Sequence, residues 1–362
     1  MRPIRAITVV AMALAVLAGC AGERAMFRGG AAHDGRYADG AITEPGSPVW
    51  TRETGAKSYS SPVAGGASVY FGNNAGTLYA LAAADGSVRW RQSTNGNIEA
   101  PAAYADGTVY FGSWDGVVRA VDAATGEIRW TFETGGRVYS APTVTAERVY
   151  FGSADGKVYA VDRASGRAAW SFPTGDRVYS SPAVSGGRVY VGSLDGNVYA
   201  LDAASGAEQW RFGTGRAVFA SVAAGDGVVA VGSYDKSMYL LDAASGSELW
   251  RFRTGNRIYA SAALTEDAVV FASTDGYVYS VSRRTGAKNW DFRTRDKVYS
   301  SPAVTADSVF VGSTDGRFYA LALGDGSERW RFDAGQAIYA SPSLREGRVY
   351  FSDVGGTVYV LD

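Results

Sequence analysis

The sequence has very little of the side chains that build metal centres and nucleophilic sites. It contains one cysteine, Cys20, and one histidine, His33. A single cysteine excludes a disulfide within the chain, and a single histidine leaves few ways to assemble a metal site or a catalytic triad. We therefore expect no metal centre and no catalytic residue. His33 lies in a polar, glycine-rich stretch, where it is expected to cap a turn.

Charge is also scarce. Charged residues make up 20% of the chain, and 35 lysines and arginines stand against 36 aspartates and glutamates. A protein that binds nucleic acid needs a strongly basic surface to hold the phosphate backbone. Nucleic acid is therefore not an expected partner.

A helical period is absent after the first twenty residues. The chain instead has 46 glycines and an aromatic content of 13%. This composition is typical of many short strands that are joined by tight turns. It predicts an all-β fold.

Residues 1–19 are predicted to be a lipoprotein signal peptide. Arg2 and Arg5 precede an apolar stretch at 6–18, which is shorter than the ~20 residues of a membrane-spanning helix. The stretch ends in Leu-Ala-Gly-Cys, which resembles a bacterial lipobox and implies a diacylglycerol on Cys20. Residues 20–45 are then the lipid anchor and a linker, and the membrane is contacted through the anchor alone. The alternative is a free cysteine in an ordinary secretory leader.

Tryptophan recurs every forty residues without a slip. A period near forty predicts a propeller or a solenoid, in which each unit buries its faces against its neighbours. The eight positions are Trp50, Trp90, Trp130, Trp170, Trp210, Trp250, Trp290 and Trp330.

Each repeat reads as four antiparallel strands. In one repeat they are expected at 178–184, 188–193, 197–202 and 207–213, with glycine-containing turns between them. Four such strands form a propeller blade. Residues 338–362 supply three strands, and the missing outer strand is found at 46–50. The sequence thus predicts an eight-bladed β-propeller over 46–362, closed by pairing of an N-terminal strand with the C-terminal strands.

One segment of the repeat resembles a known motif. Residues 200–210, ALDAASGAEQW, are similar to the tryptophan-docking motif of propeller repeats of the pyrroloquinoline quinone (PQQ) type, and they recur at 120–130, 160–170 and 240–250. The resemblance covers 46–362. It implies that the eight tryptophans are structural and pack between adjacent blades.

The resemblance points to two groups of proteins. The quinoprotein dehydrogenases bind PQQ and calcium, are much longer, and carry a disulfide of adjacent cysteines that this chain cannot form. The other group is non-enzymatic and includes a lipoprotein scaffold for outer-membrane β-barrel assembly. We therefore expect a scaffold without a cofactor, with a protein partner such as a β-barrel assembly component. Its location is the periplasmic face of the outer membrane, or the outer face of the cytoplasmic membrane in a host with one membrane. The alternative is a dehydrogenase-like or cofactor-binding propeller that holds PQQ and calcium.

Function is expected where the repeat breaks. Loops between blades and the turns between second and third strands share one face. At the tips of these turns, Trp114, Leu194 and Tyr234 stand where nothing in the repeat buries them, so we predict that they bind the partner. Local packing across the neighbouring turn is the alternative. A glycan-binding lipoprotein is a further alternative that exposed aromatic residues favour.

Charged residues alternate on the same face. Basic residues precede the first strand in five repeats, and aspartates occupy the turn tips in six. These residues could form an anion-binding funnel or pair between blades for ~0–1 kcal/mol each. They are Lys57, Arg137, Arg177, Arg257 and Lys297, and Asp115, Asp155, Asp195, Asp235, Asp275 and Asp315.

One sector departs most from the repeat. Glu99 occupies a position that is Tyr or Phe in the other seven repeats. With four nearby asparagines it forms a candidate polar or ion site, because Glu and Asn oxygens can bind calcium. Sequence drift in a terminal blade is the alternative. The asparagines are Asn73, Asn74, Asn95 and Asn97.

Overall fold

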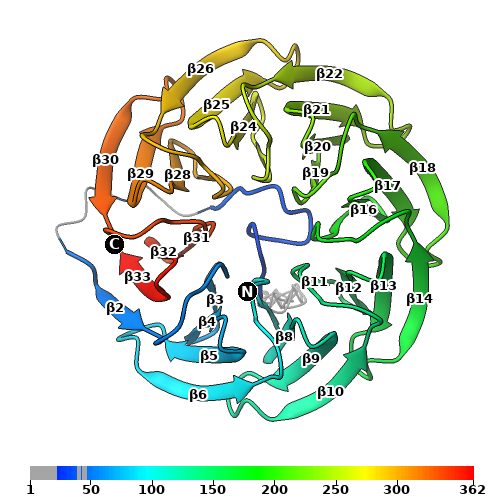
Figure 1. Cartoon of the computed structure of the whole chain (residues 1–362), viewed down its shortest axis with the longest axis vertical. Coiled ribbons are helices and arrows are strands. Elements are labelled where there is room, and N and C mark those ends of the chain that lie inside the picture. The colour runs from blue at the N-terminus through cyan, green and yellow to red at the C-terminus, as the bar shows by residue number, and fades with distance from the viewer. Residues whose placement is uncertain (1–22, 39–41, 43–46) are drawn as a thin grey trace, which may run out of the picture.

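The structure, a computed structural model, describes residues 23–38, 42 and 47–362. Eight antiparallel sheets, one for each four-stranded blade, stand in a ring around a central axis (Figure 1). This confirms the predicted eight-bladed β-propeller. One sheet has a fifth strand, β1 (Arg24–Ala25), at its inner edge. The described residues contain no helix that is long and apolar enough to cross a membrane. The predicted signal peptide and Cys20 lie outside the described residues.

We number the blades by the chain order of their inner strands. Blade 1 contains β3 (Val63–Gly65), β4 (Ser68–Gly72), β5 (Thr77–Ala82) and β6 (Val88–Ser93); blade 2 contains β7 (Ala103–Ala105), β8 (Thr108–Gly112), β9 (Val117–Asp122) and β10 (Ile128–Glu133); blade 3 contains β11 (Thr143–Val144), β12 (Arg148–Gly152), β13 (Lys157–Asp162) and β14 (Ala168–Pro173); blade 4 contains β15 (Ala183–Ser185), β16 (Arg188–Gly192), β17 (Asn197–Asp202) and β18 (Glu208–Gly213).

The second half of the ring has the same layout. Blade 5 contains β19 (Ala223–Gly225), β20 (Val228–Gly232), β21 (Ser237–Asp242) and β22 (Glu248–Arg253); blade 6 contains β23 (Ala263–Leu264), β24 (Ala268–Ala272), β25 (Tyr277–Ser282) and β26 (Lys288–Arg293); blade 7 contains β27 (Ala303–Val304), β28 (Ser308–Gly312), β29 (Arg317–Ala322) and β30 (Glu328–Asp333); blade 8 contains β31 (Ser343–Arg345), β32 (Arg348–Ser352), β33 (Thr357–Leu361) and, outermost, β2 (Trp50–Glu53).

The ring closes as predicted. Strand β2 pairs with β33 in antiparallel register, from Trp50 opposite Val360 to Glu53 opposite Thr357. The N-terminal strand therefore completes a blade begun by the C-terminal strands. This pairing removes the open sheet edge that a three-stranded blade would expose.

The inner strand is shorter than predicted. Of the segment 178–184, residues 178–182 are irregular and β15 begins at Ala183. Pro182 has no N–H to donate to a ladder, and serine hydroxyls replace the missing backbone partners. Ser180 Oγ accepts from Gly192 N at 3.1 Å, and Ser181 N donates to Ser221 Oγ of the next blade at 2.9 Å.

The docking tryptophans link each blade to the next. Trp210 Nε1 donates to the carbonyl of Ala243, thirty-three residues later, at 3.1 Å, and its ring lies on Gly246. A Cβ on Gly246 would stand 2.5 Å from Trp210 Cδ2. All eight tryptophans are buried or nearly so. At the closure, the carbonyl of Ile42 accepts the bond from Trp330 at 3.3 Å.

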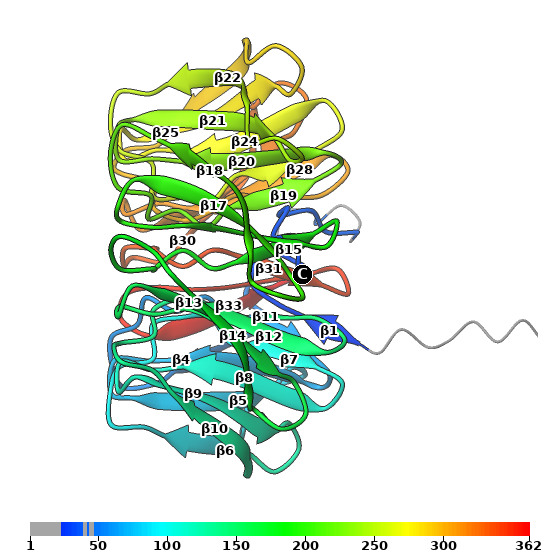
Figure 2. The same cartoon turned by 90° about the vertical axis from the view of Figure 1, so that its right-hand side faces the viewer.

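An N-terminal segment, Glu23–Tyr37, crosses the centre of the ring on one face (Figures 1 and 2), and we call it the strap. It begins as β1 (Arg24–Ala25), which pairs with β7 of blade 2. Its carbonyls then accept hydrogen bonds from equivalent inner-strand N–H groups, which lie forty residues apart. The pairs are Val184 to Ala31, Ala224 to Ala32, Leu264 to Asp34 and Val304 to Gly35.

His33 lies in a turn of the strap, where its N–H donates to Gly30 O at 3.0 Å. The side chain is fully buried, with Nε2 3.0 Å from Thr143 Oγ1 and the ring edge on Phe27. Burial, with the nearby Arg28 guanidinium, lowers the pKa of His33 to about 3. The strap therefore docks with a neutral imidazole.

Acid should loosen the strap through His33. A released His33 takes up a proton as the pH falls below its ordinary pKa of about 6.5, whereas the docked one does so near 3, so docking weakens by about 2 kcal/mol between pH 7 and pH 5. Amide hydrogen exchange of residues 26–37, corrected for intrinsic rates, measures this effect. The variant His33→Asn, which tolerates the positive φ of 52°, should lose the pH dependence. Equal pH dependence in both proteins would contradict the assignment.

The glycine beneath each docking tryptophan can be tested with a matched pair. Gly246 (φ +73°) lies under Trp210, whereas a Cβ on Gly227 (φ +80°) would meet no atom within 4 Å. Alanine at either site costs ~1 kcal/mol for its backbone conformation, and Gly246→Ala adds about 1–3 kcal/mol because it overpacks the tryptophan. Urea unfolding of both variants measures the difference. Equal losses of stability would show that the contact is not tight.

Candidate binding face and axial cup

The strap divides the molecule into two faces. Glu23 accepts hydrogen bonds from the turns between first and second strands, at Gly66 N and Asp106 N. We call this side the strap face. The opposite side, which carries the loops between blades and the turns between second and third strands, is the open face.

Turn aspartates on the open face are used by the fold. Asp195 Oδ2 accepts from Gly175 N of the preceding loop at 2.7 Å and from the hydroxyl of Tyr199 at 2.7 Å. Burial and this bond raise the pKa of Tyr199 to about 12, so it stays a donor. The same pattern holds at Asp155, Asp235, Asp275 and Asp315.

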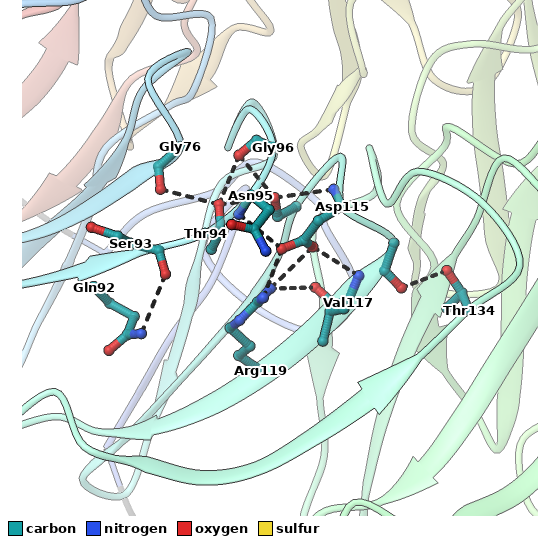
Figure 3. Close-up of polar contacts among 12 residues, drawn as sticks. Gly76, Gln92, Ser93, Thr94, Asn95, Gly96, Asp115, Val117, Arg119 and Thr134 are labelled. Carbon is teal, nitrogen blue, oxygen red and sulfur yellow. Dashed lines mark hydrogen bonds and ion pairs between the residues drawn. The ribbon is translucent and has the colours of Figure 1, made fainter.

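Blade 2 departs from this pattern (Figure 3). Arg119 replaces the tyrosine, and its guanidinium lies 2.6 Å from Asp115 Oδ2. Asp115 also accepts from Val117 N and Asn95 N. Burial of Asp115 opposes its ionisation, but Arg119 and these N–H groups outweigh burial and lower its pKa.

The basic residues of the open face do not pair between blades. None of the five forms an ion pair within the described part of the chain. Two of them lie on aromatic rings instead, Arg137 over Trp114 and Arg257 over Tyr234. Because the turn aspartates are bound to backbone and tyrosine groups, the loops of this face keep positive charge that no carboxylate pairs with.

The predicted exposure of the turn-tip residues is wrong. Trp114, Leu194 and Tyr234 are half-buried. Arg137 lies 4.6 Å from the Trp114 ring centroid, and Tyr234 packs 4.6 Å from the ring of Tyr259. For Trp114 and Tyr234 the cause is cation–π and aromatic packing against the following loop, which the alternating sequence pattern does not reveal. Leu194 and Tyr234 lie on adjacent blades, whereas blade 3 separates them from Trp114. Their role as partner-binding residues stays a prediction.

Eight equivalent residues, one from each blade, converge on the axis just before the inner strands. Neighbouring aromatic rings in this set lie 5.0–5.5 Å apart, centroid to centroid. Tyr139 and Phe219 are two blades apart, yet their ring centroids are only 5.6 Å from each other. The eight side chains therefore narrow the central opening of the propeller. The set is Tyr59, Glu99, Tyr139, Tyr179, Phe219, Tyr259, Tyr299 and Tyr339.

A cavity of about 300 Å³ lies at this ring, and we call it the axial cup. Its lining consists of Glu99 and six of the aromatic residues. A second cavity of about 120 Å³ lies on the strap side, where Phe27 and a circle of serines bound it. The sequence reasoning noted Glu99 as an exception but missed the cup. The signal was present in the forty-residue spacing of the aromatic positions.

Only some of the asparagines predicted to form a polar site with Glu99 lie beside it. Glu99 is 8% exposed and accepts from Asn97 Nδ2 at 3.2 Å. Burial raises the pKa of Glu99, and hydrogen bonds with Asn97, Tyr139 and Asn74 oppose that shift. These residues therefore form one cluster at the cup.

Asn73 and Asn95 do not belong to that cluster. Asn73 Oδ1 accepts from the N–H groups of Ala75 and Thr77. Asn73 therefore binds the backbone of this turn in place of the usual turn aspartate, because blade 1 has Ala75 at the aspartate position. Asn95 is exposed in its loop and contacts Asp115 through its backbone N–H.

The cup does not fit a calcium–quinone centre. Calcium takes about six to eight oxygen ligands, and the cup offers a single carboxylate whose oxygens already accept from neutral donors. Within the described residues there is no group of three or more His, Cys, Asp or Glu side chains that could hold a metal ion. PQQ is itself a tricarboxylate, which Glu99 would repel.

Comparison with protein families gives one match that covers most of the chain. The family model described as outer membrane protein assembly factor BamB matches residues 38–193, 115–221, 194–298 and 274–362. No curated protein matches the sequence.

Solved structures with the same fold include proteins of different activities. BamB from Moraxella catarrhalis is 23% identical, with a TM-score of 0.68 over 81% of this chain and 90% of that one. Quinohemoprotein alcohol dehydrogenase from Comamonas testosteroni is 15% identical, with a TM-score of 0.79 over 92% and 79%. The computationally designed Ika8 protein is 19% identical, with a TM-score of 0.79 over 87% and 99%. At these identities the likeness concerns the fold.

Proposed function

Because the chain belongs to the family of PQQ-type repeat propellers described as outer membrane protein assembly factor BamB, we propose that it is a non-enzymatic, lipid-anchored scaffold. It assists the assembly of outer-membrane β-barrel proteins and binds its protein partner through the open face. The observation that carries this proposal is the division of the disc, because the strap covers the opposite face and leaves the open face free.

The place of the predicted anchor supports this orientation. Cys20 stands three residues before Glu23, and three residues span at most about 10 Å. Glu23 is bound to the turns of the strap face through Gly66 N and Asp106 N. A lipid on Cys20 therefore holds the strap face toward the bilayer and turns the open face away from it. In a host with an outer membrane, the open face looks into the periplasm.

The chemistry of the open face suits a protein partner. Positive side chains that lack carboxylate partners lie beside half-buried apolar and aromatic groups at the turn tips. Trp, Tyr and Arg are enriched among the few interface positions that carry most binding energy. The partner surface is expected to be acidic at its edge and apolar at its centre.

The proposal is tested by a triple variant, Trp114→Ala/Leu194→Ala/Tyr234→Ala. Cross-linked pull-down from the native membrane should recover a β-barrel assembly component with the parent protein and lose it with the variant. The matched control is Ile128→Ala/Leu249→Ala, which removes two residues that are 50% and 52% exposed on outer strands. A second variant, Arg177→Glu/Lys297→Glu, weakens the same capture without touching the turn-tip packing.

Two results would overturn the proposal. The first is that the triple and charge-reversal variants fold normally and still capture the same partners. The second is that PQQ with Ca²⁺ produces a bound-quinone absorbance or dye-linked alcohol oxidation, which would make the protein an enzyme. We expect neither a bound-quinone absorbance nor dye-linked alcohol oxidation.

A further inference from the structure

The axial cup combines two features that the scaffold function does not use. The first is the lining of six aromatic side chains around a cavity of about 300 Å³. The second is Glu99, the single departure from an aromatic residue among eight equivalent positions. Symmetry brings both features to one point on the axis.

Glu99 is a buried carboxylate whose charge is only partly offset by the nearby Arg137 guanidinium. It is 8% exposed and forms no ion pair with any described residue. Its donors are neutral, namely the amides of Asn97 and Asn74 and the hydroxyl of Tyr139. Buried charges are ordinarily paired, so a cavity bounded by this carboxylate favours a cation.

The aromatic lining favours a particular kind of cation. The face of an aromatic ring carries a negative quadrupole, and several such faces around one cavity attract alkylated ammonium groups, which lose little hydration on entering. A metal ion would instead need a set of oxygen ligands, which the cup does not offer.

The charges around the cup define the rest of the ligand. The carboxylate of Asp296 acts electrostatically on Tyr299 and Tyr339. Three basic residues act with the opposite sign, Arg137 on Glu99, Arg257 on Tyr299 and Lys297 on Tyr339. Each stands two residues before a ring position, or at most about 7 Å of extended chain. A simple cation would meet these positive groups on its way in, whereas a zwitterion would present its anionic group to them.

We propose that the axial cup binds a zwitterion with an alkylated ammonium group, which lies among the aromatic rings against Glu99 while the anionic group faces the basic residues of the adjoining loops. The chemistry is shared by a free small zwitterion and by a phosphocholine lipid headgroup. This site adjoins the proposed partner-binding residues, because Tyr234 packs on Tyr259 of the cup, but Glu99 itself is not one of them.

The test uses three probes with the full chain. Phosphocholine is the zwitterion, choline is the cation alone, and 3,3-dimethyl-1-butanol has the shape of choline without its charge. Binding is followed by titration with proton NMR, because ring currents move the methyl signals of a group enclosed by aromatic faces. Phosphocholine should bind most tightly, and the neutral alcohol should bind at least about tenfold more weakly than choline.

Variants separate the cup from other effects. Glu99→Gln should weaken choline binding at least about tenfold, and Glu99→Tyr, which restores the residue of the repeat, should abolish it in a folded protein. Glu266→Gln is the matched control, because it removes an exposed carboxylate from a turn of the strap face. Co-sedimentation with phosphatidylcholine vesicles distinguishes a headgroup from a free zwitterion, and either source supports the site.

The proposal is overturned if the neutral alcohol binds as tightly as choline. It is also overturned if Glu99→Gln binds choline as well as the parent protein does, or if choline and phosphocholine cause no shift. Glu99→Gln leaves the turn-tip residues in place, so loss of its choline binding with partner capture intact would keep the two sites distinct.

Discussion

The docking of one tryptophan per blade onto the next blade is the contact on which the rest of the structure depends. Seven of the eight indole N–H groups donate to a carbonyl thirty-three residues later, and each of these seven rings lies on a glycine of the same turn. A buried Trp removes ~150–250 Å² from water. Because the same tryptophan contact repeats around the ring, each blade is rotated by the same angle relative to the blade before it. At the closure, the carbonyl of Ile42 accepts the hydrogen bond from the eighth, Trp330.

Closure turns a linear repeat into a radial one, and this brings distant residues together. Positions forty residues apart become neighbours around the axis, so one unusual side chain in a single repeat faces seven copies of the usual one. Glu99 stands among tyrosines for this reason. The same geometry lets four carbonyls of the strap, between Ala31 and Gly35, accept hydrogen bonds from equivalent N–H groups of blades 4 to 7. The two faces of the disc thus acquire different chemistry from one repeated sequence.

The sequence predicts the features that follow from its forty-residue period. The number of blades, the closure by β2 and the burial of the tryptophans all follow from forty-residue spacing and glycine turns. It fails where a contact depends on side chains that only one or two repeats carry. The exposure expected for Trp114 is wrong because Arg137 of the following loop covers it, and Asn73 is a turn residue because Ala75 no longer supplies a carboxylate. The strap's path across the ring has no period of its own.

The docking contact is tested most directly by the free energies of unfolding in urea of two variants, Trp210→Ala and Trp114→Ala. Trp114 is the one tryptophan outside the docking set of eight. Trp210→Ala should lose about 3–5 kcal/mol, because a buried indole, its hydrogen bond and its contact with Gly246 are removed together. Trp114→Ala should lose clearly less, since its side chain is half-buried at a turn tip. An unchanged unfolding free energy for Trp210→Ala would contradict the structural role of the docking tryptophans. It would also contradict the arrangement of the two faces that depends on them.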